Sequence, residues 1–173
     1  TRVWPGTVGG RVRGLRGHSQ AVSPVAFLGE VVHRGAAGND GSFRRGSLGD
    51  GSRQQLGAGD VVSARGAARA PDGRLLAVAS FDKALRVWNL PVAESQGDVV
   101  GGHTDAIYGL SFGAGDTTVY SASLDGSVRA WDVTTGEPIA SFDGHTHGVC
   151  GVATTPAGDR MVSGSIDGTV RVW

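Results

Sequence analysis

Three residue types that can act together as nucleophile, base and orienting acid occur twice in this chain with the same spacing. They are His103, Ser121 and Asp125, and, 42 residues later, His145, Ser163 and Asp167. A serine, an imidazole and a carboxylate in mutual contact form the catalytic triad of many hydrolases. A catalytic centre is needed once, however, whereas a group that recurs in successive repeats serves a need of each repeat. The recurrence therefore favours a structural hydrogen-bonded network, and no catalytic residue is predicted.

The repetition extends along the chain with a period of 42 or 43 residues. The four tryptophans stand at positions 4, 88, 131 and 173, which are separated by whole numbers of periods, and Gly46 occupies the one position where a tryptophan is absent. Self-similarity at this period is typical of repeat architectures in which each unit packs on the next. The strongest matches between units are Gly102 and His103 with Gly144 and His145, Asp125 with Asp167, Arg129 with Arg171, and Trp131 with Trp173.

Within a unit, short apolar runs alternate with glycine-containing turns, which is the pattern of β-strands. One unit has runs at 107–112, 119–123 and 127–131. We expect a type I′ hairpin turn at Asp125-Gly126, because Asp-Gly tolerates the positive φ that this turn requires at both central positions. A fourth run, such as 138–142, precedes each Gly-His pair. The sequence therefore predicts an all-β fold with four short antiparallel strands per unit.

Four short strands every 42 residues, with Gly-His near one end of the unit and Trp131-Asp132 at the other, resemble the WD-repeat β-propeller family. The resemblance implies an all-β propeller fragment of about four blades, each a four-stranded antiparallel sheet. It also implies that the recurrent His, Ser, Asp and Trp form a buried hydrogen-bonded tetrad in each complete blade. These structural tetrads are His103, Ser121, Asp125 and Trp131, and His145, Ser163, Asp167 and Trp173.

The units are delimited by their closing tryptophan positions. Residues 1–4 are interpreted as the last strand of a preceding blade, 5–46 as a degenerate blade, 47–88 as a partly degenerate blade, and 89–131 and 132–173 as blades.

The two earlier units depart from the tetrad. The unit 47–88 has Asp60 and Val78 in place of the His and the Ser, and the unit 5–46 has Ala36 and Gly46 in place of the Ser and the Trp. A polar group left without its partner costs about 1–3 kcal/mol, so we expect these two blades to be looser. Residues 43–69 admit two interpretations, a decayed blade or a reading-frame error, and the amino-acid sequence leaves both open.

The resemblance further implies a partner-binding surface at one end of the blades. In this family, contact residues lie three and five positions after the His and one position before the turn Asp. The matching positions are rich in aromatic and aliphatic residues and include an arginine, a composition found in protein-binding hot spots. An equally open interpretation is that these side chains only cap the ends of the blades. The partner-binding candidates are Arg65, Phe81, Tyr108, Leu124, Cys150 and Ile166.

No cofactor and no metal ion is predicted. His145 and His147 offer two imidazoles, but no third ligand is nearby and the tetrad engages His145. The glycine-rich residues 9–14 lack the strand-to-helix setting and the Lys-Ser/Thr ending of a phosphate loop. Cys150 has no base at a fixed spacing, which favours a surface or packing residue over a nucleophile.

The composition narrows the function classes. Among the 173 residues, the 30 glycines predict many tight turns. The single cysteine excludes an intrachain disulfide bond, and we expect a cytoplasmic location. No apolar run is long enough for a membrane span. Residues 1–70 carry ten arginines against four acidic residues (+6), and residues 71–173 carry six basic against twelve acidic residues (−6). The arginines stand among glycines without interleaved aromatic residues, so nucleic-acid binding is not favoured. The richness in Arg, Gly and Ala points to a bacterial source, and the start without Met predicts that the numbering begins inside a longer protein.

These observations favour a non-catalytic protein–protein interaction scaffold within a larger signalling protein. By resemblance, bacterial repeats of this family are joined to protein kinases and signalling ATPases. A protein or peptide is the expected partner, and the remaining blades are expected from the same longer chain or from a second copy. Two alternatives stay open. One is a propeller-based enzyme with a site in the central channel, although the first strands supply Ala, Val, Cys and Gly there; the other is nucleic-acid binding through the arginine-rich first half.

Overall fold

The computed structural model describes residues 2–3, 13–14, 19–27, 33–38, 42–47, 53–57, 63–90, 94–99 and 102–173. Every regular element within these ranges is a β-strand, which confirms the predicted all-β class. The described residues also include no helix with the length and apolar character that a membrane crossing requires.

The strands pair in chain order into five antiparallel sheets. The first sheet is the pair β1 (Arg2–Val3) and β2 (Arg13–Gly14). Three four-stranded sheets follow. The first of them is made of β3 (Val22–Phe27), β4 (His33–Gly38), β5 (Phe43–Ser47) and β6 (Arg53–Gly57), and the second of β7 (Ala64–Arg69), β8 (Leu75–Ser80), β9 (Leu85–Asn89) and β10 (Glu94–Val99). The third is made of β11 (Ile107–Phe112), β12 (Thr118–Ser123), β13 (Val128–Asp132) and β14 (Pro138–Phe142). The last sheet has three strands, β15 (Val149–Thr154), β16 (Met161–Ser165) and β17 (Val170–Val172).

The sheets are offset from the sequence units by one strand. β14 pairs with β13, the strand that carries Trp131, and β10 pairs with β9, the strand that carries Trp88. A unit that ends at a tryptophan therefore contributes its opening strand to the preceding sheet and its next three strands to its own sheet. This overlap ties neighbouring sheets together through the chain itself.

The described residues of the weakly repetitive stretch 43–69 include the whole of strands β5, β6 and β7. Its backbone therefore follows the four-strand pattern of the later units. The side chains of β3 to β6 that would show loose packing lie almost entirely outside the described residues. The looser packing of this blade stays a prediction, and the choice between decay and a reading-frame error stays open.

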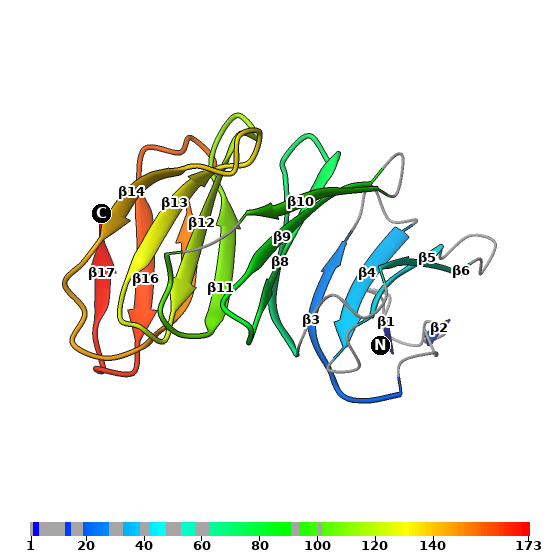
Figure 1. The fold of residues 1–173 in the computed structure, drawn as a ribbon, viewed down its shortest axis with the longest axis horizontal. Coiled ribbons are helices and arrows are strands. Elements are labelled where there is room, and N and C mark those ends of the chain that lie inside the picture. Colours follow the sequence, from blue (N-terminus) through cyan, green and yellow to red (C-terminus); the bar gives the residue numbers. More distant parts are fainter. Residues whose placement is uncertain are drawn as a thin grey trace, which may run out of the picture.

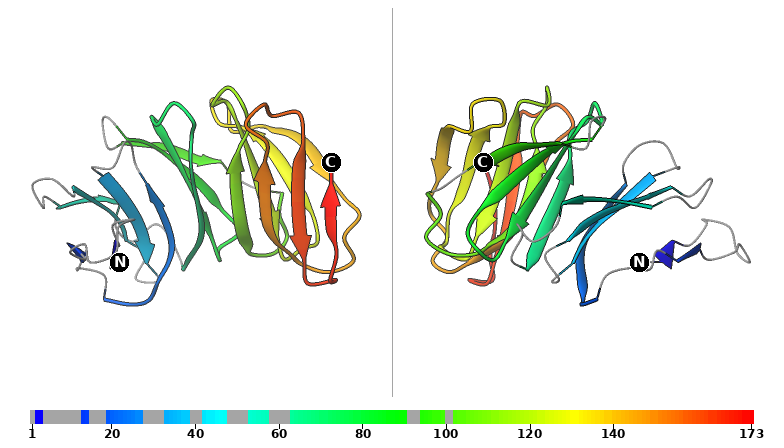
Figure 2. Two further views of the ribbon diagram at one scale, coloured as in Figure 1. Left: turned by 180° about the vertical axis from the view of Figure 1, so that it is seen from behind. Right: turned by 45° about the vertical axis from the view of Figure 1, so that its right-hand side comes forward.

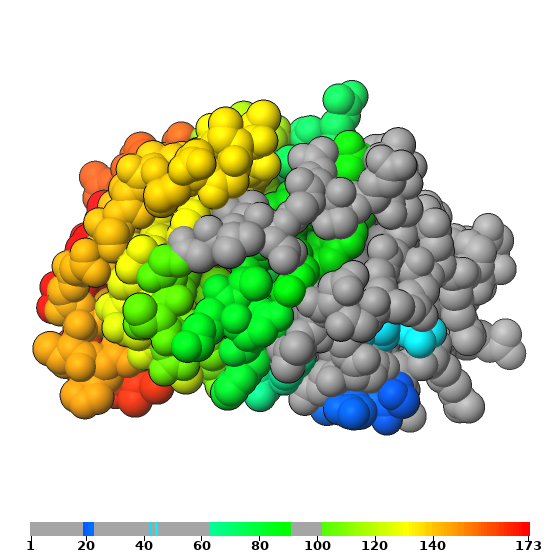
Figure 3. Space-filling model, viewed as in Figure 1, coloured from blue at the N-terminus to red at the C-terminus, as the bar shows by residue number. Residues whose placement is uncertain are grey.

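The sheets stand side by side with their first strands innermost (Figures 1 and 2). β3 contacts β7, β7 contacts β11, and β11 contacts β15. The later strands of each sheet turn away from this row, so the sheets spread like the blades of a partial propeller. Figure 1 shows β16 and β17 of the last sheet at one end of this row, and in the space-filling view from the same side the gold and orange atoms of β14 and the following loop cover most of that end (Figure 3).

Apolar side chains fill the space between neighbouring sheets. Between β7–β10 and β11–β14, Leu85 and Val87 pack with Val119 and Trp131, all at most 1% exposed. The next interface is smaller. There Ala122, Val128, Val149 and Met161 are buried, with the rings of Tyr120, Phe142 and Trp173 packed against them. Full burial of a Val, Leu or Met side chain stabilises a fold by about 1.5–3 kcal/mol, so these interfaces hold the sheets together.

The described first strands share an irregularity at the same place. In β7, β11 and β15 the register shifts by one residue, which leaves a single residue of the first strand unpaired just before a glycine. A Cβ on Gly66 would lie 2.8 Å from the carbonyl oxygen of Tyr108, and one on Gly109 would lie 3.0 Å from the Cα of Gly151. These glycines therefore allow adjacent first strands to approach closely. The unpaired bulge residues are Arg65, Tyr108 and Cys150.

The turn at Asp125 and Gly126 differs from the predicted type I′ turn. Gly126 has a φ of 91°, whereas Asp125 keeps an ordinary negative φ. The Ser123 N–H donates to the Ser127 carbonyl and the Gly126 N–H to the Ser123 carbonyl, both at 3.2 Å. The connection is thus a three-residue hairpin loop with only the glycine in the left-handed region. The prediction was wrong because it ignored the Asp125 side chain, whose Oδ1 accepts the Ser127 N–H at 2.9 Å and holds the aspartate backbone in an ordinary conformation.

Lys83 occupies the position of Gly126 in the β8–β9 turn and holds a φ of 71°. A side chain in this region is strained, so the Lys83→Gly variant should be more stable by about 1 kcal/mol. Urea unfolding at 25 °C measures the difference. The Ala84→Gly variant is the control, because Ala84 has an ordinary φ, and it should lose about 0.5–1 kcal/mol. A loss of stability in both variants would contradict the strain at Lys83.

Candidate functional site

The structure brings His103, Ser121, Asp125 and Trp131 together in one hydrogen-bonded chain. The Trp131 Nε1–H donates to Ser121 Oγ at 2.7 Å, and Ser121 Oγ lies 2.7 Å from His103 Nε2. His103 Nδ1 lies 2.8 Å from Asp125 Oδ2, and the His103 side chain is fully buried. Because Asp125 can only accept, Nδ1 carries the proton. The Ser121 hydroxyl accepts from the indole and has two acceptors for its own proton, His103 Nε2 at 2.7 Å and the more distant Arg129 carbonyl at 3.5 Å. The shorter contact favours a neutral imidazole with its proton on Nδ1.

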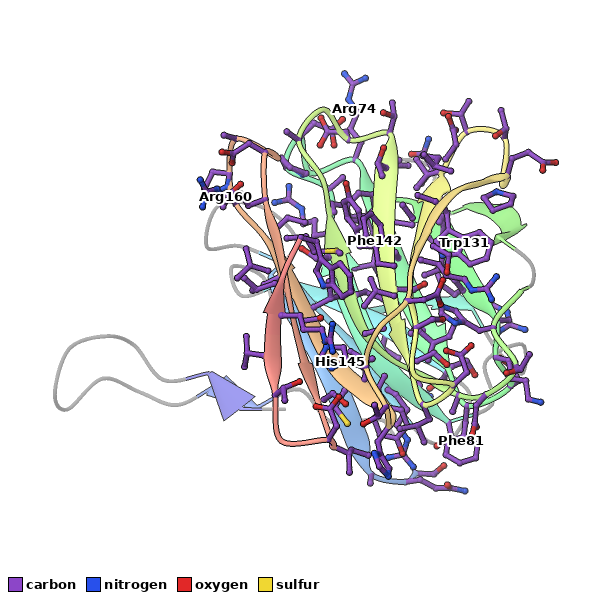
Figure 4. The ribbon with its side chains drawn as sticks, turned by 90° about the vertical axis from the view of Figure 1, so that its left-hand side faces the viewer. Arg74, Phe81, Trp131, Phe142, His145 and Arg160 are labelled. Carbon is purple, nitrogen blue, oxygen red and sulfur yellow. The ribbon has the colours of Figure 1, made fainter. Side chains whose placement is uncertain are left out.

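His145, Ser163, Asp167 and Trp173 repeat this arrangement one sheet later. The Trp173 Nε1–H donates to Ser163 Oγ at 2.9 Å, His145 Nε2 lies 2.9 Å from that oxygen, and His145 Nδ1 lies 2.8 Å from Asp167 Oδ2. Figure 4 shows His145 and Trp131 within their two sheets. Both ring nitrogens of His145 are engaged, so this side chain is not presented to a metal ion.

The turn aspartates are held by more donors than the histidine alone. Asp125 Oδ1 accepts from the Ser127 hydroxyl at 2.7 Å, and Oδ2 also accepts from the Thr104 N–H at 3.0 Å. Burial alone would raise the pKa of Asp125, but hydrogen bonds from Ser127, His103 and Thr104 outweigh burial and lower the pKa to about 2. The Thr169 hydroxyl, 2.6 Å away, is the main reason why the pKa of Asp167 lies well below its usual range. Both carboxylates are therefore ionised at neutral pH.

Sequence reasoning missed this outer layer of hydroxyl groups. Ser127 and Thr169 each follow an Asp-Gly pair, a triplet visible in the sequence. Ser123 Oγ donates to the Asp105 carbonyl at 2.9 Å and accepts the Asp125 N–H at 3.1 Å, and Ser165 does the same around Asp167. The recurrence of serine at positions 80, 123 and 165 was the available signal.

The burial of Ser121 distinguishes this network from a catalytic triad. Ser121 is 0% exposed and Ser163 2% exposed. A nucleophile must reach its substrate, and the Ser121 oxygen already accepts from Trp131 and contacts His103. The geometry therefore gives these serines a role as hydrogen-bonding hubs between β-strands.

In the sheet β7–β10 the turn carboxylate has a charged partner that is not a histidine. Val78, which replaces the hub serine, is fully buried. The turn residue Asp82 still accepts the Ala84 N–H at 3.0 Å, and its Oδ2 pairs with Arg86 Nη1 at 2.9 Å. A guanidinium from the third strand thus occupies the role of the imidazole and keeps the turn carboxylate paired.

Three of the partner-binding candidates lie together across two sheets. The guanidinium carbon of Arg65 is 5.4 Å from the ring centre of Phe81 and 5.6 Å from that of Tyr108, within the range of cation–π contacts. Arg65 and Tyr108 are both bulge residues, and bulges redirect side chains out of the regular ladder. Phe81 is 46% exposed. The stack therefore joins adjacent blades and keeps an aromatic surface open to solvent.

The other three candidates are placed differently. Leu124 packs over Gly148, where an added Cβ would lie 2.7 Å from Leu124 Cδ2. Ile166 is 64% exposed and Cys150 is an exposed free thiol. In Figure 4, Phe81 lies at one end of the strands, and Arg74 and Arg160 lie at the opposite end. Leu124 thus belongs partly to the packing between sheets, whereas Ile166 and Cys150 are open to solvent.

The family model for the WD domain, or G-beta repeat, matches residues 59–89, 95–132 and 136–173, more than half of the chain. The chain therefore belongs to the WD40-repeat family, and the resemblance on which the sequence interpretation rested is confirmed.

Individual relatives agree with this assignment. The chain is 42% identical over 62 residues to Periodic tryptophan protein 2 of Arabidopsis thaliana, covering 36% of this chain and 7% of that protein. It is 26% identical over 162 residues to the Ribosome biogenesis protein WDR12 homolog of Oryza sativa subsp. japonica, covering 71% and 37% of the two chains. The solved structure of U3-55K superimposes with a TM-score of 0.84 at 26% identity, covering 93% of this chain and 51% of that one. The chain thus spans about half of this solved structure and at most 37% of the two curated relatives.

The hub position can be tested by substitution. The Ser121→Ala variant leaves the Trp131 N–H and His103 Nε2 without their partner inside a dry core, so unfolding should become easier by about 2–4 kcal/mol. Ser163→Ala should cost less, because Trp173 is only half-buried. Urea unfolding compares these variants with Ser141→Ala, an exposed strand position expected to change stability by less than about 0.5 kcal/mol. Equal effects of Ser121→Ala and Ser141→Ala would contradict a hub role.

The network also predicts how stability depends on pH. Burial lowers the pKa of His103 below its usual 6.5, against the raising effect of Asp125. His103 and Asp125 both have lower pKa values in the folded than in the unfolded chain, so their stabilisation is complete above the unfolded values and is lost as the pH falls. The loss should begin below about pH 6.5 through His103 and continue between about pH 4 and pH 2 through Asp125. Urea unfolding at pH 7, 5 and 3 measures it. An unchanged slope between pH 7 and pH 5 in the His103→Gln variant would contradict the assignment to His103.

Proposed function

We propose that this chain is a non-catalytic scaffold that binds a protein or peptide through the end of its blades that carries Phe81. The observation that carries the proposal is the stack of Arg65, Phe81 and Tyr108, which spans two sheets on backbone bulges. Exposed Ile166 and Cys150 extend the candidate surface onto the following turns and strands. Aromatic groups and arginine at the centre of a patch are the side chains that contribute most to protein-binding free energy.

Rigidity of the surface supports the same proposal. Arg65 lies between two rings, so its guanidinium is already oriented before a partner arrives, and little conformational entropy remains to be lost. The bulges fix the direction of the Arg65 and Tyr108 side chains, and the buried hydrogen-bonded networks hold the turns that follow. Such a preformed surface suits recognition of an extended peptide or a loop of another protein.

Participation in a larger assembly is part of the proposal. WD40 proteins typically bind protein partners, and one relative is named for ribosome biogenesis in rice. We extend to this chain the idea of a component of a multi-protein complex. The narrower inference of a bacterial signalling protein gains no support from the two curated relatives described above, which come from plants. A cytoplasmic location remains a proposal, and the free thiol of Cys150 fits a reducing compartment.

The two alternatives predict different behaviour. A propeller-based enzyme would need accessible reactive groups, whereas the best Ser-His-Asp sets here are buried and mutually bonded. Nucleic-acid binding would depend on the +6 charge of residues 1–70. Binding of duplex DNA or RNA that weakens steeply between 50 and 300 mM salt would favour that alternative.

A random 12-residue peptide library displayed on phage can test the proposal. Peptides enriched on the wild-type chain should lose at least about tenfold in affinity for a Phe81→Ala plus Ile166→Ser variant, because the anchor side chains are removed. The Arg74→Ala plus Arg160→Ala variant, altered at the opposite end, is the matched control and should bind like the wild type. A library that yields no binder, or binders that distinguish only the control variant, would contradict the proposed surface.

A further inference from the structure

Two cationic residues depart from the repeat at the same end of the β7–β10 sheet. Arg65 occupies the bulge position of β7, where β11 and β15 carry a phenol and a thiol. Lys83 occupies the position in the β8–β9 turn that Gly126 and Gly168 hold in the two later sheets. Arg65 stacks on Phe81, and Lys83 follows Phe81 by two positions in the same turn. Both departures therefore adjoin one exposed aromatic ring.

The Lys83 side chain is retained at a conformational cost. Lys83 has a φ of 71°, close to the 91° and 82° of Gly126 and Gly168. Left-handed backbone costs a residue with a Cβ about 1 kcal/mol, which a glycine would avoid. The side chain is exposed and makes no hydrogen bond or ion pair with any described residue, so no contact in the chain offsets this cost. A strained residue that the fold does not require points to a role in binding.

Arg65 also has no anionic partner among the described residues. The rings of Phe81 and Tyr108 lie against its guanidinium, and its buried Nε has no hydrogen-bond acceptor there. Arg86 of the same sheet, by contrast, pairs with Asp82 at 2.9 Å. A guanidinium carries its N–H groups in its own plane, where they match the two oxygens of a carboxylate. The acceptor for Arg65 must therefore come from outside the described part of the chain.

The charge around Phe81 selects the kind of partner. Among the described residues of β7 and of the β8–β9 hairpin at this end, three cations, Arg65, Lys83 and Arg86, stand against one carboxylate, Asp82, which leaves +2. Residues 71–173 as a whole carry −6. An acidic segment is thus attracted to this spot and repelled elsewhere on the later blades. Phosphate groups are recognised by clusters of arginines, whereas the one unpaired guanidinium here suits a carboxylate.

We propose that the partner-binding surface is specific for an acidic peptide segment, which places an aliphatic or aromatic side chain on Phe81 and a carboxylate on Arg65. Lys83 attracts a second acidic residue of the same segment. The inference rests on the proposed scaffold function and specifies the chemistry of its partner. Arg65 and Lys83 thereby give one blade a recognition function that the repeat itself does not supply.

The peptides that the phage library yields test the composition. Peptides enriched on the wild-type chain should contain Asp or Glu at least about twice as often as the unselected library, within two residues of an aliphatic or aromatic residue. Enriched peptides that require Phe81 but show no excess of acidic residues would overturn the acidic partner and leave the scaffold function intact. A library without binders would overturn both.

Fluorescence anisotropy with one enriched acidic peptide, made synthetically, tests the two cations. Lys83→Gly should weaken binding about threefold at about 50 mM salt although the variant is more stable, because a charge is lost while strain is relieved. Lys83→Arg should bind like the wild type. Arg65→Gln should weaken binding at least about tenfold. Arg74→Gln, at an exposed side chain of the opposite end, is the matched control and should bind like the wild type.

These variants separate recognition from folding. The loss in Lys83→Gly should shrink at about 300 mM salt, because the attraction between exposed charges is screened. Circular dichroism and thermal unfolding check each variant, and Lys83→Gly keeps the test decisive if Arg65→Gln folds poorly. Wild-type affinity in Lys83→Gly, or an equal loss in Lys83→Gly and Arg74→Gln, would overturn the proposal.

Changes in the peptide identify the group that Arg65 binds. A peptide with its acidic residues replaced by Asn and Gln should bind the wild type at least about tenfold more weakly, and Arg65→Gln should then cause little further loss, because both changes remove one interaction. Fully additive losses would overturn the pairing of Arg65 with a carboxylate. A phosphoserine in place of the acidic residue should bind within about threefold of the acidic peptide. Binding more than about tenfold tighter would overturn the carboxylate in favour of a phosphate group.

Discussion

A tryptophan buried between β-strands imposes the constraint on which each complete blade depends. Its ring supplies apolar area to the core, but its N–H must find an acceptor in a place that water does not reach. Ser121 Oγ accepts the indole N–H, and the same hydroxyl is paired with His103 Nε2. The other ring nitrogen of His103 donates to Asp125. The series of hydrogen bonds ends at this carboxylate, which also accepts from several backbone and hydroxyl donors. One indole in the third strand thus determines residues in the second strand, in the following turn and in the segment before the first strand.

The β7–β10 sheet shows which members of this hydrogen-bonded series can be replaced. It lacks the hub serine, yet its turn carboxylate still has a charged partner, because Arg86 pairs with Asp82 at 2.9 Å with both side chains largely buried. In the two blades that have the complete tetrad, the arginine at the same position lies elsewhere. Arg171 sits with its guanidinium carbon 6.0 Å from the Trp173 ring centre, and Arg129 lies near Gly102. The carboxylate of the turn is therefore the fixed element, and either an imidazole or a guanidinium can serve it.

The tetrads could be predicted from the sequence because their members recur at a fixed period, and recurrence separates structural from catalytic groups. The hydroxyls of Ser127 and Thr169 were not predicted as part of the network, because serine and threonine are common at turns for reasons of local turn conformation alone. The turn geometry was mispredicted because Asp-Gly was judged by backbone preference alone, while the side chain of Asp125 decides the conformation. The contact between Arg65, Phe81 and Tyr108 could not be read from any single unit, since it joins residues of two sheets across a bulge whose only sequence trace is the following glycine.

The bulge in the first strand places two roles next to each other: the glycine allows neighbouring sheets to pack closely, and the residue before it presents a side chain. At the unpaired position, three of the four described first strands, β7, β11 and β15, carry Arg65, Tyr108 and Cys150, which supply a cation, a phenol and a thiol. The next residue is glycine in all three. The glycine is required where a neighbouring backbone comes within van der Waals contact, whereas the bulge residue before it has no directly opposed residue in the ladder. Side-chain identity can therefore vary at these positions while the stack of sheets stays the same, so a repeat that is uniform in its polar network can present a different chemical group from each blade.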